Sequence, residues 1–441
     1  MIYTIFNLKK KSDLFNKKLF IYIHLPTLLL IILPFLLISG SLLPELAVSL
    51  SAIIFIVNSF KNNLAKYYKN TYFYFFIVFY LILILSSLLS NYPDKALLKS
   101  LFYLRFGIFA LSTWYLISVN PKIIHYIFYS LSLAFSILLI DGYFQFFNGV
   151  NLFGFPIHGT RVSSLFGTEL ILGSYLSRLL PILLACLIFF LKSKKNNYLL
   201  FFSIIIFILA DVLIFLSGER ASFFFVNFSA LFLIIFLNSY KKFRIISFIT
   251  SIFLILIISN FYPKYKERIF DKTLDQISFN KKFNFSFETT TDTSYLFTIE
   301  HDFLFKTAFA MFLENKILGV GPKLFRVECY NPKYFKAIFS CSTHPHNTYI
   351  QLLAETGIAG FSIIFFGFIF LSYYCCKHLY LKFFYKKKTL SDFQISLISA
   401  VFITLWPIVP TGNFFNNWIS IVYYLPLGML LWSFNKKIFQ R

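Results

Sequence analysis

Apolar residues along this chain gather into runs of roughly 20 residues, separated by polar or basic connections. A helix needs about 20 residues to cross about 30 Å of hydrocarbon. The runs show weak helical periodicity, as expected of helices that are apolar on every side and face lipid. The pattern therefore predicts an all-α polytopic membrane protein with about 12 transmembrane helices. The predicted spans are 19–38, 42–60, 72–90, 97–118, 122–141, 166–191, 197–217, 221–238, 243–261, 357–376, 394–412 and 416–434.

The composition agrees with a membrane protein. Of the 441 residues, 58% are hydrophobic and 13% are charged, whereas soluble domains carry about 25% charged residues. This supply of apolar residues excludes an intrinsically disordered chain. Five cysteines in 441 residues exclude a disulfide-stapled scaffold.

The basic residues are unevenly divided between alternate loops. The net charge is +23, yet the short loops of one set hold only Lys95, Arg161 and Arg220. The positive-inside rule places the other, basic set and both termini in the cytoplasm, which requires an even number of spans. The charge is thus a topology signal, helped by anionic lipid, and we expect no nucleic-acid binding. Segment 19–38 is longer than the apolar part of a typical signal peptide, so we expect it to be kept as a span.

One long extramembrane stretch, residues 262–356, faces away from the cytoplasm in this topology. It separates an N-terminal membrane bundle of about nine spans (1–261) from about three C-terminal spans (357–441). Its Thr-rich part near 288–292 is expected to be a solvated loop. We therefore predict a large loop region on the side away from the cytoplasm that contains short helices.

Two short helices are expected within this loop. Phe residues at helical spacing predict an amphipathic helix over 301–315, ended by the glycines and proline of 319–322. A second helix is expected over 348–356, with Asn347 or Thr348 as its N-cap and Gln351 completing a capping box with Thr348. Gly357 marks its C-terminal side.

Five ionisable residues inside predicted spans stand out as candidates, and all five lie in the half nearest the large loop. Such groups are costly in a membrane and are functional candidates. Their shared position indicates a polar cavity that opens to the far side. The alternative is pairing between helices that only fixes their packing. The five are Arg105, Asp141, Glu169, Arg178 and Asp211.

Arg220 lies in a very short outer turn after Ser217, Gly218 and Glu219. A tight turn holds its side chain at the membrane surface, where its planar guanidinium suits a lipid phosphate. We expect Glu219 to orient it. The alternative is simple contact with lipid headgroups.

His344 and His346 form a His-x-His pair just before the second helix of the loop. Zinc binding would need further ligands, and no convincing third ligand lies nearby. A histidine near neutral pKa is suited to act as a general base, and the helix N-terminus favours its neutral form. A structural capping or packing role is the competing interpretation.

The segment from His346 to Gly360 (HNTYIQLLAETGIAG) resembles the signature of the O-antigen ligase family, which includes O-antigen polymerase-like and related glycan transferases. Segments 161–173, 217–221 and 317–325 resemble further family segments in the expected order. The resemblance covers roughly residues 150–376. It does not separate a ligase from a polymerase, nor does it identify the sugars or the oligomeric state.

The resemblance implies an inner-membrane enzyme whose active site faces the periplasm. Such a ligase moves a glycan from undecaprenyl pyrophosphate to a sugar hydroxyl of the lipid A core. Its partners would be this donor, the acceptor and membrane lipid. We expect direct, inverting transfer without a metal or other cofactor, since cations can neutralise the leaving pyrophosphate. An O-antigen polymerase or another lipid-linked glycan transferase is the alternative, and a non-enzymatic transporter is a third.

By position, His346 matches the proposed base and Arg220 a pyrophosphate-binding arginine of the family. A second family arginine is missing, because His301 holds its place; His301, Arg268 or Lys306 is expected to supply the charge. The expected substrate-binding residues are Arg161, Glu169, Arg178, Glu219, Arg268, His301 and His344.

Two of the five cysteines, Cys329 and Cys341, lie in the outer loop. The periplasm is oxidising, whereas Cys186 lies in a span and Cys375 and Cys376 lie near the cytoplasm, so we predict a Cys329–Cys341 disulfide. It would tether the segment that leads to the histidine pair.

Overall fold

The structure is a computed structural model that describes residues 20–193, 196–277 and 298–435. Within these ranges the chain is helical, with two isolated β-bridges and no strand, which confirms the all-α class. The first helices are α3 (Leu25–Leu36), α4 (Leu42–Lys61), α5 (Thr71–Leu88), α6 (Pro93–Val119), α7 (Ile123–Asn148), α8 (Leu172–Ser193), α9 (Asn197–Leu216), α10 (Arg220–Phe236) and α11 (Lys241–Phe261). The remainder are α12 (Pro263–Lys266), α13 (Lys272–Ile277), α14 (Ile299–Glu314), α15 (Phe325–Glu328), α16 (Thr348–Tyr385), α17 (Asp392–Thr404) and α18 (Asn417–Asn435).

Nine helices in the described ranges are long and apolar enough to cross a membrane: α4 to α9, α11, α16 and α18. Three shorter apolar helices, Phe20–Leu36, α10 and α17, occupy the other predicted spans. Each of the 12 predicted runs therefore contains a helix. The number of helices that cross the membrane stays a prediction, as do the three-part division of the chain and its orientation.

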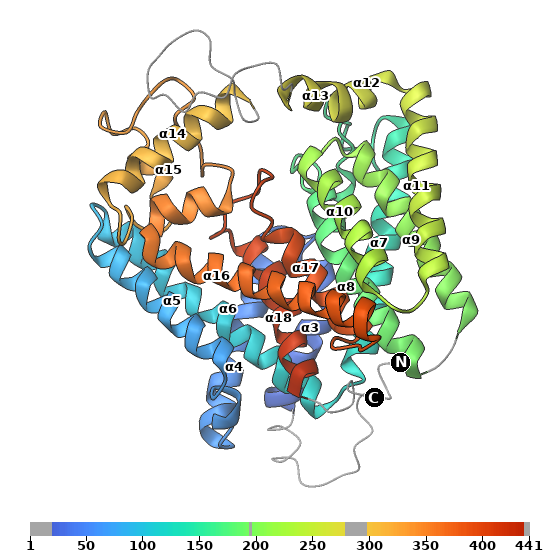
Figure 1. Ribbon diagram of the computed structural model, residues 1–441, viewed down its shortest axis with the longest axis horizontal. Helices are drawn as coiled ribbons and strands as arrows, with labels where there is room; N and C mark the ends of the chain where they lie inside the picture. Colours follow the sequence, from blue (N-terminus) through green and yellow to red (C-terminus); the bar gives the residue numbers. More distant parts are fainter. Residues whose placement is uncertain (1–19, 194–195, 278–297, 436–441) are drawn as a thin grey trace.

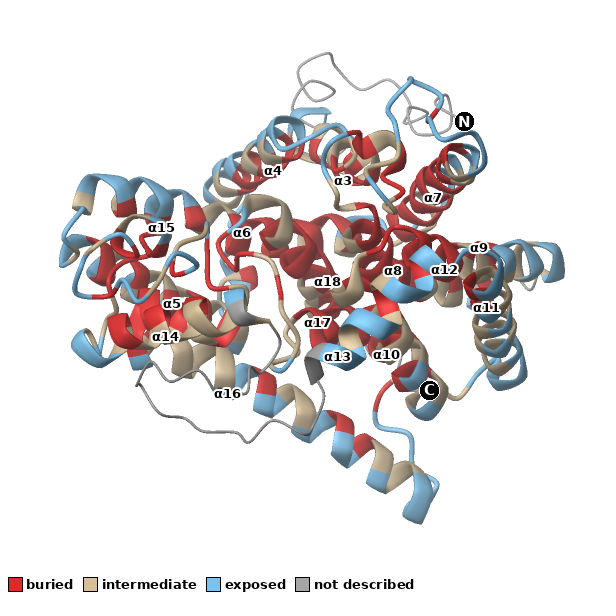
Figure 2. Cartoon of the chain, turned by 90° about the horizontal axis from the view of Figure 1, so that it is seen from above, coloured by how far each residue is buried: buried red, intermediate tan, exposed pale blue. Residues whose placement is uncertain are grey.

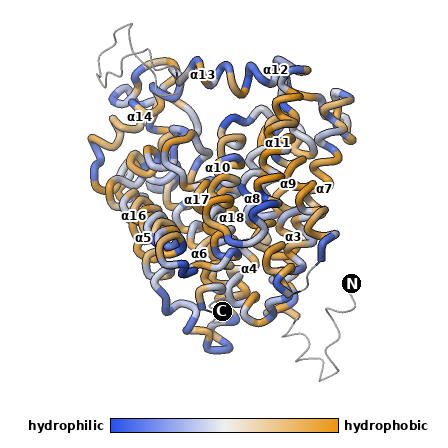
Figure 3. The backbone as a smooth tube through the Cα atoms, turned by 45° about the vertical axis from the view of Figure 1, so that its right-hand side comes forward, coloured by the Kyte–Doolittle hydropathy of each residue, from blue (hydrophilic) through white to orange (hydrophobic). Residues whose placement is uncertain are grey.

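Helices α6, α8, α17 and α18 form the buried centre of the bundle (Figure 2). Within this centre α6 packs against α18, and α8 packs against α17. Helices α11 and α16 lie outside it, since only 17% of the apolar window of each is buried. The short helices α12 to α15 lie at one end of the bundle (Figure 1), and hydrophilic residues recur along α12 and α13 (Figure 3). The short helices of the predicted loop region therefore lie together at one end of the molecule.

Two predicted spans extend well beyond the helices that they contain. The span 166–191 begins later, because Gly167 takes a left-handed φ of 58° and α8 begins only at Leu172. Glu169 thus precedes the helix rather than lying inside it. The span 394–412 ends early: α17 stops at Thr404, and a loop with prolines at 407 and 410 follows. Proline cannot continue the helical hydrogen bonding.

The predicted short helix 348–356 and the span 357–376 form one element, α16, interrupted at Gly357 (φ 59°, ψ −166°). Residues 316–321 cross this break and form backbone hydrogen bonds on both sides of it. A side chain on Gly357 would overlap the backbone of Ile317, and one on Gly319 would overlap that of Glu355. The two glycines therefore permit this crossing. The bonds are Val320 N to Ala354 O (2.9 Å), Gly321 N to Glu355 O (3.0 Å), Ile358 N to Lys316 O (2.8 Å) and Ala359 N to Ile317 O (3.2 Å).

Helix α14 (Ile299–Glu314) matches the predicted amphipathic helix over 301–315, although it ends before the glycine turn. Thr298 caps it, its hydroxyl accepting from the backbone N–H of His301 at 3.2 Å. Leu304, Ala308 and Met311 pack into a small hydrophobic cluster of their own with residues that follow the glycine turn. This cluster holds α14 beside the start of α16.

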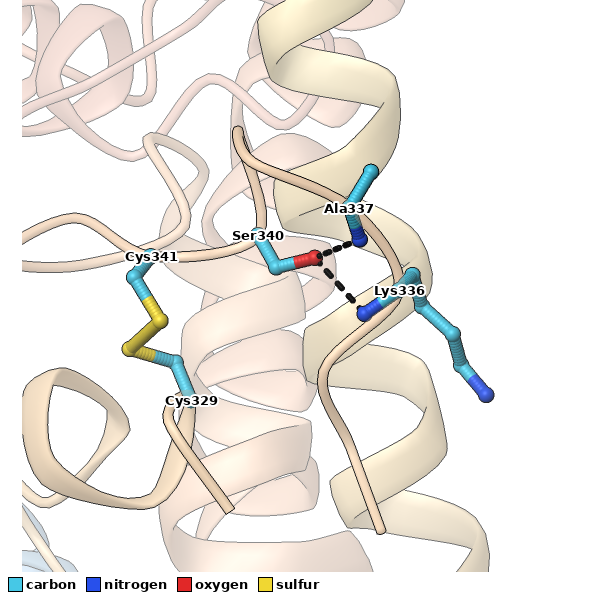
Figure 4. Close-up of a disulfide and its surroundings, with 5 residues drawn as sticks. All are labelled: Cys329, Lys336, Ala337, Ser340 and Cys341. Carbon is cyan, nitrogen blue, oxygen red and sulfur yellow. Dashed lines mark hydrogen bonds between the residues drawn. A yellow bond between two sulfur atoms is a disulfide. The ribbon is translucent and has the colours of Figure 1, made fainter. Parts of the chain in front are cut away.

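Cys329 and Cys341 form a disulfide with a Cα–Cα distance of 5.2 Å, as predicted (Figure 4). Between them, the hydroxyl of Ser340 accepts hydrogen bonds from the backbone N–H groups of Lys336 and Ala337, both at 2.8 Å. The loop is thus closed by a covalent bond and by a local turn. It leads directly into the histidine pair.

Candidate active site

His346 has an unusual backbone conformation. Its φ is 55°, a left-handed value that few non-glycine residues adopt and that persists only where surrounding contacts enforce it. Here the carbonyl of His346 accepts a hydrogen bond from the backbone N–H of Thr411 at 2.8 Å. A loop between α17 and α18 therefore fixes the backbone of the candidate base.

His344 is held at both ring nitrogens. Nε2 donates to the carbonyl of Thr411 at 3.1 Å, and Nδ1 lies 2.9 Å from the hydroxyl of Thr343. Burial, together with the nearby charge of His346, lowers the pKa of His344 to about 3. His344 is therefore a neutral anchor for the segment, with no nitrogen left to take a proton from a substrate.

The ring of His346 is more available. Its Nε2 lies 3.3 Å from the Ser342 hydroxyl, a long hydrogen bond. Burial lowers the pKa of His346 below its usual value, while the carboxylate of Glu300 raises it. The rings of His344 and His301 lie 4.1 Å and 5.6 Å from it, centroid to centroid. His346 is thus neutral near pH 7, as a proton acceptor must be.

Asn347 is the N-cap of α16, which confirms the first of the two predicted candidates, Asn347 and Thr348. Its side-chain oxygen accepts from the backbone N–H groups of Tyr349 (3.0 Å) and Ile350 (3.1 Å). The capping box predicted for Gln351 is wrong, since its amide instead donates to Glu355 and to Asn413, both at 2.9 Å. These bonds join α16 to the loop before α18.

The arginine turn between α9 and α10 is packed between two more arginines. Nε of Arg268 donates to the carbonyl of Gly218 at 2.9 Å, and Nε of Arg161 donates to that of Ser217 at 3.3 Å. A Cβ on Gly218 would lie 2.6 Å from Nε of Arg268 and 3.1 Å from the Arg161 side chain. The glycine lets both arginines approach the turn, and the charge of Arg268 acts on that of Arg220.

Glu219 does not have the orienting role that the sequence predicted for it. Its carboxylate accepts hydrogen bonds from the backbone N–H groups of Gly173 (2.7 Å) and Ser174 (3.0 Å), at the start of α8. The hydroxyls of Ser174 (2.7 Å) and Ser222 (2.9 Å) also donate to it. Glu219 therefore joins the N-terminal ends of α8 and α10, where negative charge is favourable.

His301 lies between His346 and the turn that holds Arg220. Its ring lies 5.6 Å from that of His346, centroid to centroid, and the charge of Arg220 acts on it. Burial and the positive charges of His346 and Arg220 lower the pKa of His301 to about 4. His301 is therefore neutral in the absence of an anionic ligand, whose negative charge would raise its pKa again. Arg268, by contrast, reaches the arginine turn directly.

The two remaining predicted site residues, Glu169 and Arg178, line a cavity of about 680 Å³ that also borders His344. Arg178 is only 3% exposed, whereas Glu169 is exposed. The other three ionisable residues of the predicted spans join segments to one another, as the packing alternative proposed. Their partners are Glu45 for Arg105 (3.4 Å), Ser164 for Asp141 (2.7 Å) and Ser251 for Asp211 (2.6 Å).

Sequence reasoning missed three contributors to the site: Thr411, Ser342 and Glu300. The turn residues after position 404 were a signal that a loop, rather than a span, held Thr411. Nothing in the local sequence marks Ser342 or Glu300, because their relation to His346 depends on tertiary contacts. Among the described residues, no group of three or more His, Cys, Asp or Glu side chains is arranged to hold a metal ion.

The family model described as O-antigen ligase matches residues 204–365. This stretch contains Arg220, Arg268, His301 and the histidine pair, and it ends in α16. No curated protein matches the chain. Over residues 204–365 the chain is therefore similar to the O-antigen ligase family.

Proposed function

We propose that this protein transfers a glycan from undecaprenyl pyrophosphate to a sugar hydroxyl of the lipid A core on the periplasmic side of the inner membrane. One observation carries the proposal. A neutral histidine, His346, lies beside His301, and His301 in turn lies within reach of the charge of Arg220 in its arginine-lined turn. A hydroxyl acceptor needs a base, and a pyrophosphate leaving group needs positive charge.

His346 is the base in this mechanism. It takes the proton from the acceptor hydroxyl while that oxygen forms a bond to the anomeric carbon of the donor sugar. The bond from that carbon to the pyrophosphate oxygen breaks, and undecaprenyl pyrophosphate leaves with the electron pair. Direct attack of this kind inverts the anomeric configuration.

Arg220 stabilises the charge that develops on the pyrophosphate, and Arg268 supplies the second cation. Nε of Arg268 is fixed by Gly218, and its terminal nitrogens make no hydrogen bond to protein within the described ranges, so they remain available for phosphate oxygens. Arg161 uses Nη2 on the carbonyl of Leu170 (3.0 Å) in addition to its Ser217 bond. Its role is therefore mainly to position the turn.

Single-turnover transfer from a purified lipid-linked glycan, measured with donor binding, tests these roles. His346→Ala should slow transfer by about 10²–10⁴-fold and leave donor binding intact. Arg220→Ala should weaken both, and Arg220→Lys should restore only part, since lysine lacks the planar fork. Each variant is first checked for insertion and expression. Near-normal transfer by His346→Ala would reject it as the base.

The lipopolysaccharide of a deletion strain distinguishes a ligase from a polymerase. Loss of a ligase leaves lipid A core without any O-chain. Loss of a polymerase leaves core that carries one repeat unit, and this result would assign the same chemistry to a different acceptor.

A further inference from the structure

A second polar region borders the histidine pair at His344. It is the cavity of about 680 Å³ bordered by His344 and Thr343. Its walls come from loop 37–41, from segment 165–174 before and within α8, from Lys323 and Arg326, and from residues 412–419 before and at the start of α18. Arg220, Arg161 and Arg268 do not line it, so the cations proposed for the donor pyrophosphate lie outside.

The wall of this cavity contains a buried arginine without a carboxylate partner. Arg178 is 3% exposed, and no ion pair within the described ranges includes it. Its Nη1 makes one long hydrogen bond to the carbonyl of Ser174 (3.4 Å), and its Nε is buried without a partner in the described part of the chain. Its guanidinium lies 5.1 Å from the ring centre of Phe225. The Glu219 carboxylate acts on Arg178 only from beyond ion-pair distance. A buried charge without a direct partner is costly unless a ligand neutralises it.

Two more cations face the same space from the segment after the glycine turn. Lys323 has a left-handed φ of 62°, and burial with the positive charges of Lys99 and Arg326 lowers its pKa to about 8. Arg326 donates to the carbonyl of Thr343 at 3.4 Å. Of the two acidic residues in the lining, Glu45 is already paired with Arg105. The cavity therefore has an excess of positive charge.

The rest of the lining suits a hydroxylated ligand. Amide and hydroxyl side chains line the cavity, and the indole of Trp418 is fixed there by a hydrogen bond from Nε1 to the carbonyl of Leu37 (3.1 Å). Fixed aromatic rings and amides are common partners of polar ligands that also present apolar faces. The polar residues are Ser39, Ser41, Ser174, Asn413, Asn416 and Asn417.

We propose that this cavity binds the acceptor glycan through an anionic substituent, a phosphate or a carboxylate on the sugar, held by Arg178, Lys323 and Arg326. The proposal rests on the transferase function above and names the acceptor as an acidic glycan. His344 separates the cavity from His346, with 4.1 Å between the ring centres. A sugar anchored in the cavity can therefore present a neighbouring hydroxyl to the base, while the donor approaches from the arginine turn.

The test uses the full-length protein with three forms of one soluble core oligosaccharide: untreated, phosphatase-treated and carboxyl-reduced. The variants are Lys323→Gln and Arg326→Gln, with Lys336→Gln as the matched control, because Lys336 is an exposed lysine of the same loop region. Arg178→Gln is added if it inserts normally. Donor binding is measured for every variant.

For the untreated acceptor, Lys323→Gln and Arg326→Gln should each raise the acceptor KM by about 10–100-fold, the range for loss of a charged hydrogen bond. Donor binding and Lys336→Gln should stay at the wild-type level. One of the two treatments should raise KM for the wild type in the same way and add little in the variants. Equal KM values for all three acceptors, or no difference between Lys323→Gln and Lys336→Gln, would overturn the proposal.

A direct binding measurement separates failure of this proposal from failure of the proposed function. Quenching of tryptophan fluorescence by the untreated oligosaccharide, compared with the treated forms, reports binding without transfer. Charge-dependent binding without transfer would support the acidic-ligand site and reject the transferase. Transfer with charge-independent binding would reject the site and retain the transferase.

Discussion

Replacing Gly357 with alanine tests whether the break in α16 positions the active site. Gly357 has φ 59° and ψ −166°, a combination that costs a non-glycine residue about 1–3 kcal/mol. An added Cβ would also overlap the backbone of Ile317. The segment 316–321 must then move away from α16.

The movement would break at least two of the four backbone hydrogen bonds that cross the break. Each contributes about 0.5–1.5 kcal/mol. Together with the conformational cost, Gly357→Ala should destabilise the protein by about 2–6 kcal/mol. It should also lower transfer activity, because the first turns of α16 carry Asn347 and Gln351, which hold the histidine segment in place.

Gly367→Ala is the matched control. Gly367 lies in the same helix, with no atom within 4 Å of the Cβ that alanine would add. Alanine there should be neutral or stabilise by up to about 1 kcal/mol through helix propensity. Thermal unfolding of both variants in one detergent, with transfer activity, provides the comparison. Equal stability and activity of Gly357→Ala and Gly367→Ala would refute the reasoning.

Four further predictions concern the surroundings of the site. Cys329→Ser should destabilise the protein by about 3 kcal/mol, measured by unfolding; if reduced wild type and variant both unfold as oxidised wild type does, the disulfide contributes nothing. Glu219→Gln should lower stability by about 2–3 kcal/mol, because an amide cannot accept the four hydrogen bonds of the carboxylate; unchanged unfolding would contradict the joining role of Glu219. Transfer should fall in acid as His346 becomes protonated, with a midpoint below pH 6.5 because burial lowers its pKa. Glu300→Gln should move this acid limb to still lower pH, because the Glu300 carboxylate raises the pKa of His346 and its loss removes that effect. An unchanged pH–rate profile would show that Glu300 does not act on the base.

The helices were predictable because length and hydropathy alone decide them in a membrane protein. Their ends were less so where apolar residues continue beyond the helix. Residues 405–409 are largely apolar and read as span, yet the prolines and Gly412 turn the chain into the loop that holds Thr411. Likewise, Gly167 ends an apolar run that looked continuous with α8.

The sequence identified the main residues of the candidate site but not the contacts between them. The family resemblance identified His346 and Arg220, and the outer-loop location identified the disulfide. The contacts that distinguish His344 from His346, and that join Glu219 to the start of α8, connect residues 45 or more positions apart. No local pattern encodes such contacts, so Glu219 was given the wrong partner.

The contacts of Thr411 and Arg161 have a consequence for how this protein can be dissected. Both residues lie outside the matched stretch 204–365, one after it and one before it. Thr411 fixes the backbone of His346 and the ring of His344, and Arg161 supports the turn that presents Arg220. A fragment cut to the matched stretch would keep the proposed base, His346, and Arg220 but lose the contacts that orient each of them. The recognisable unit of sequence is therefore smaller than the unit of activity, which includes the spans on both sides.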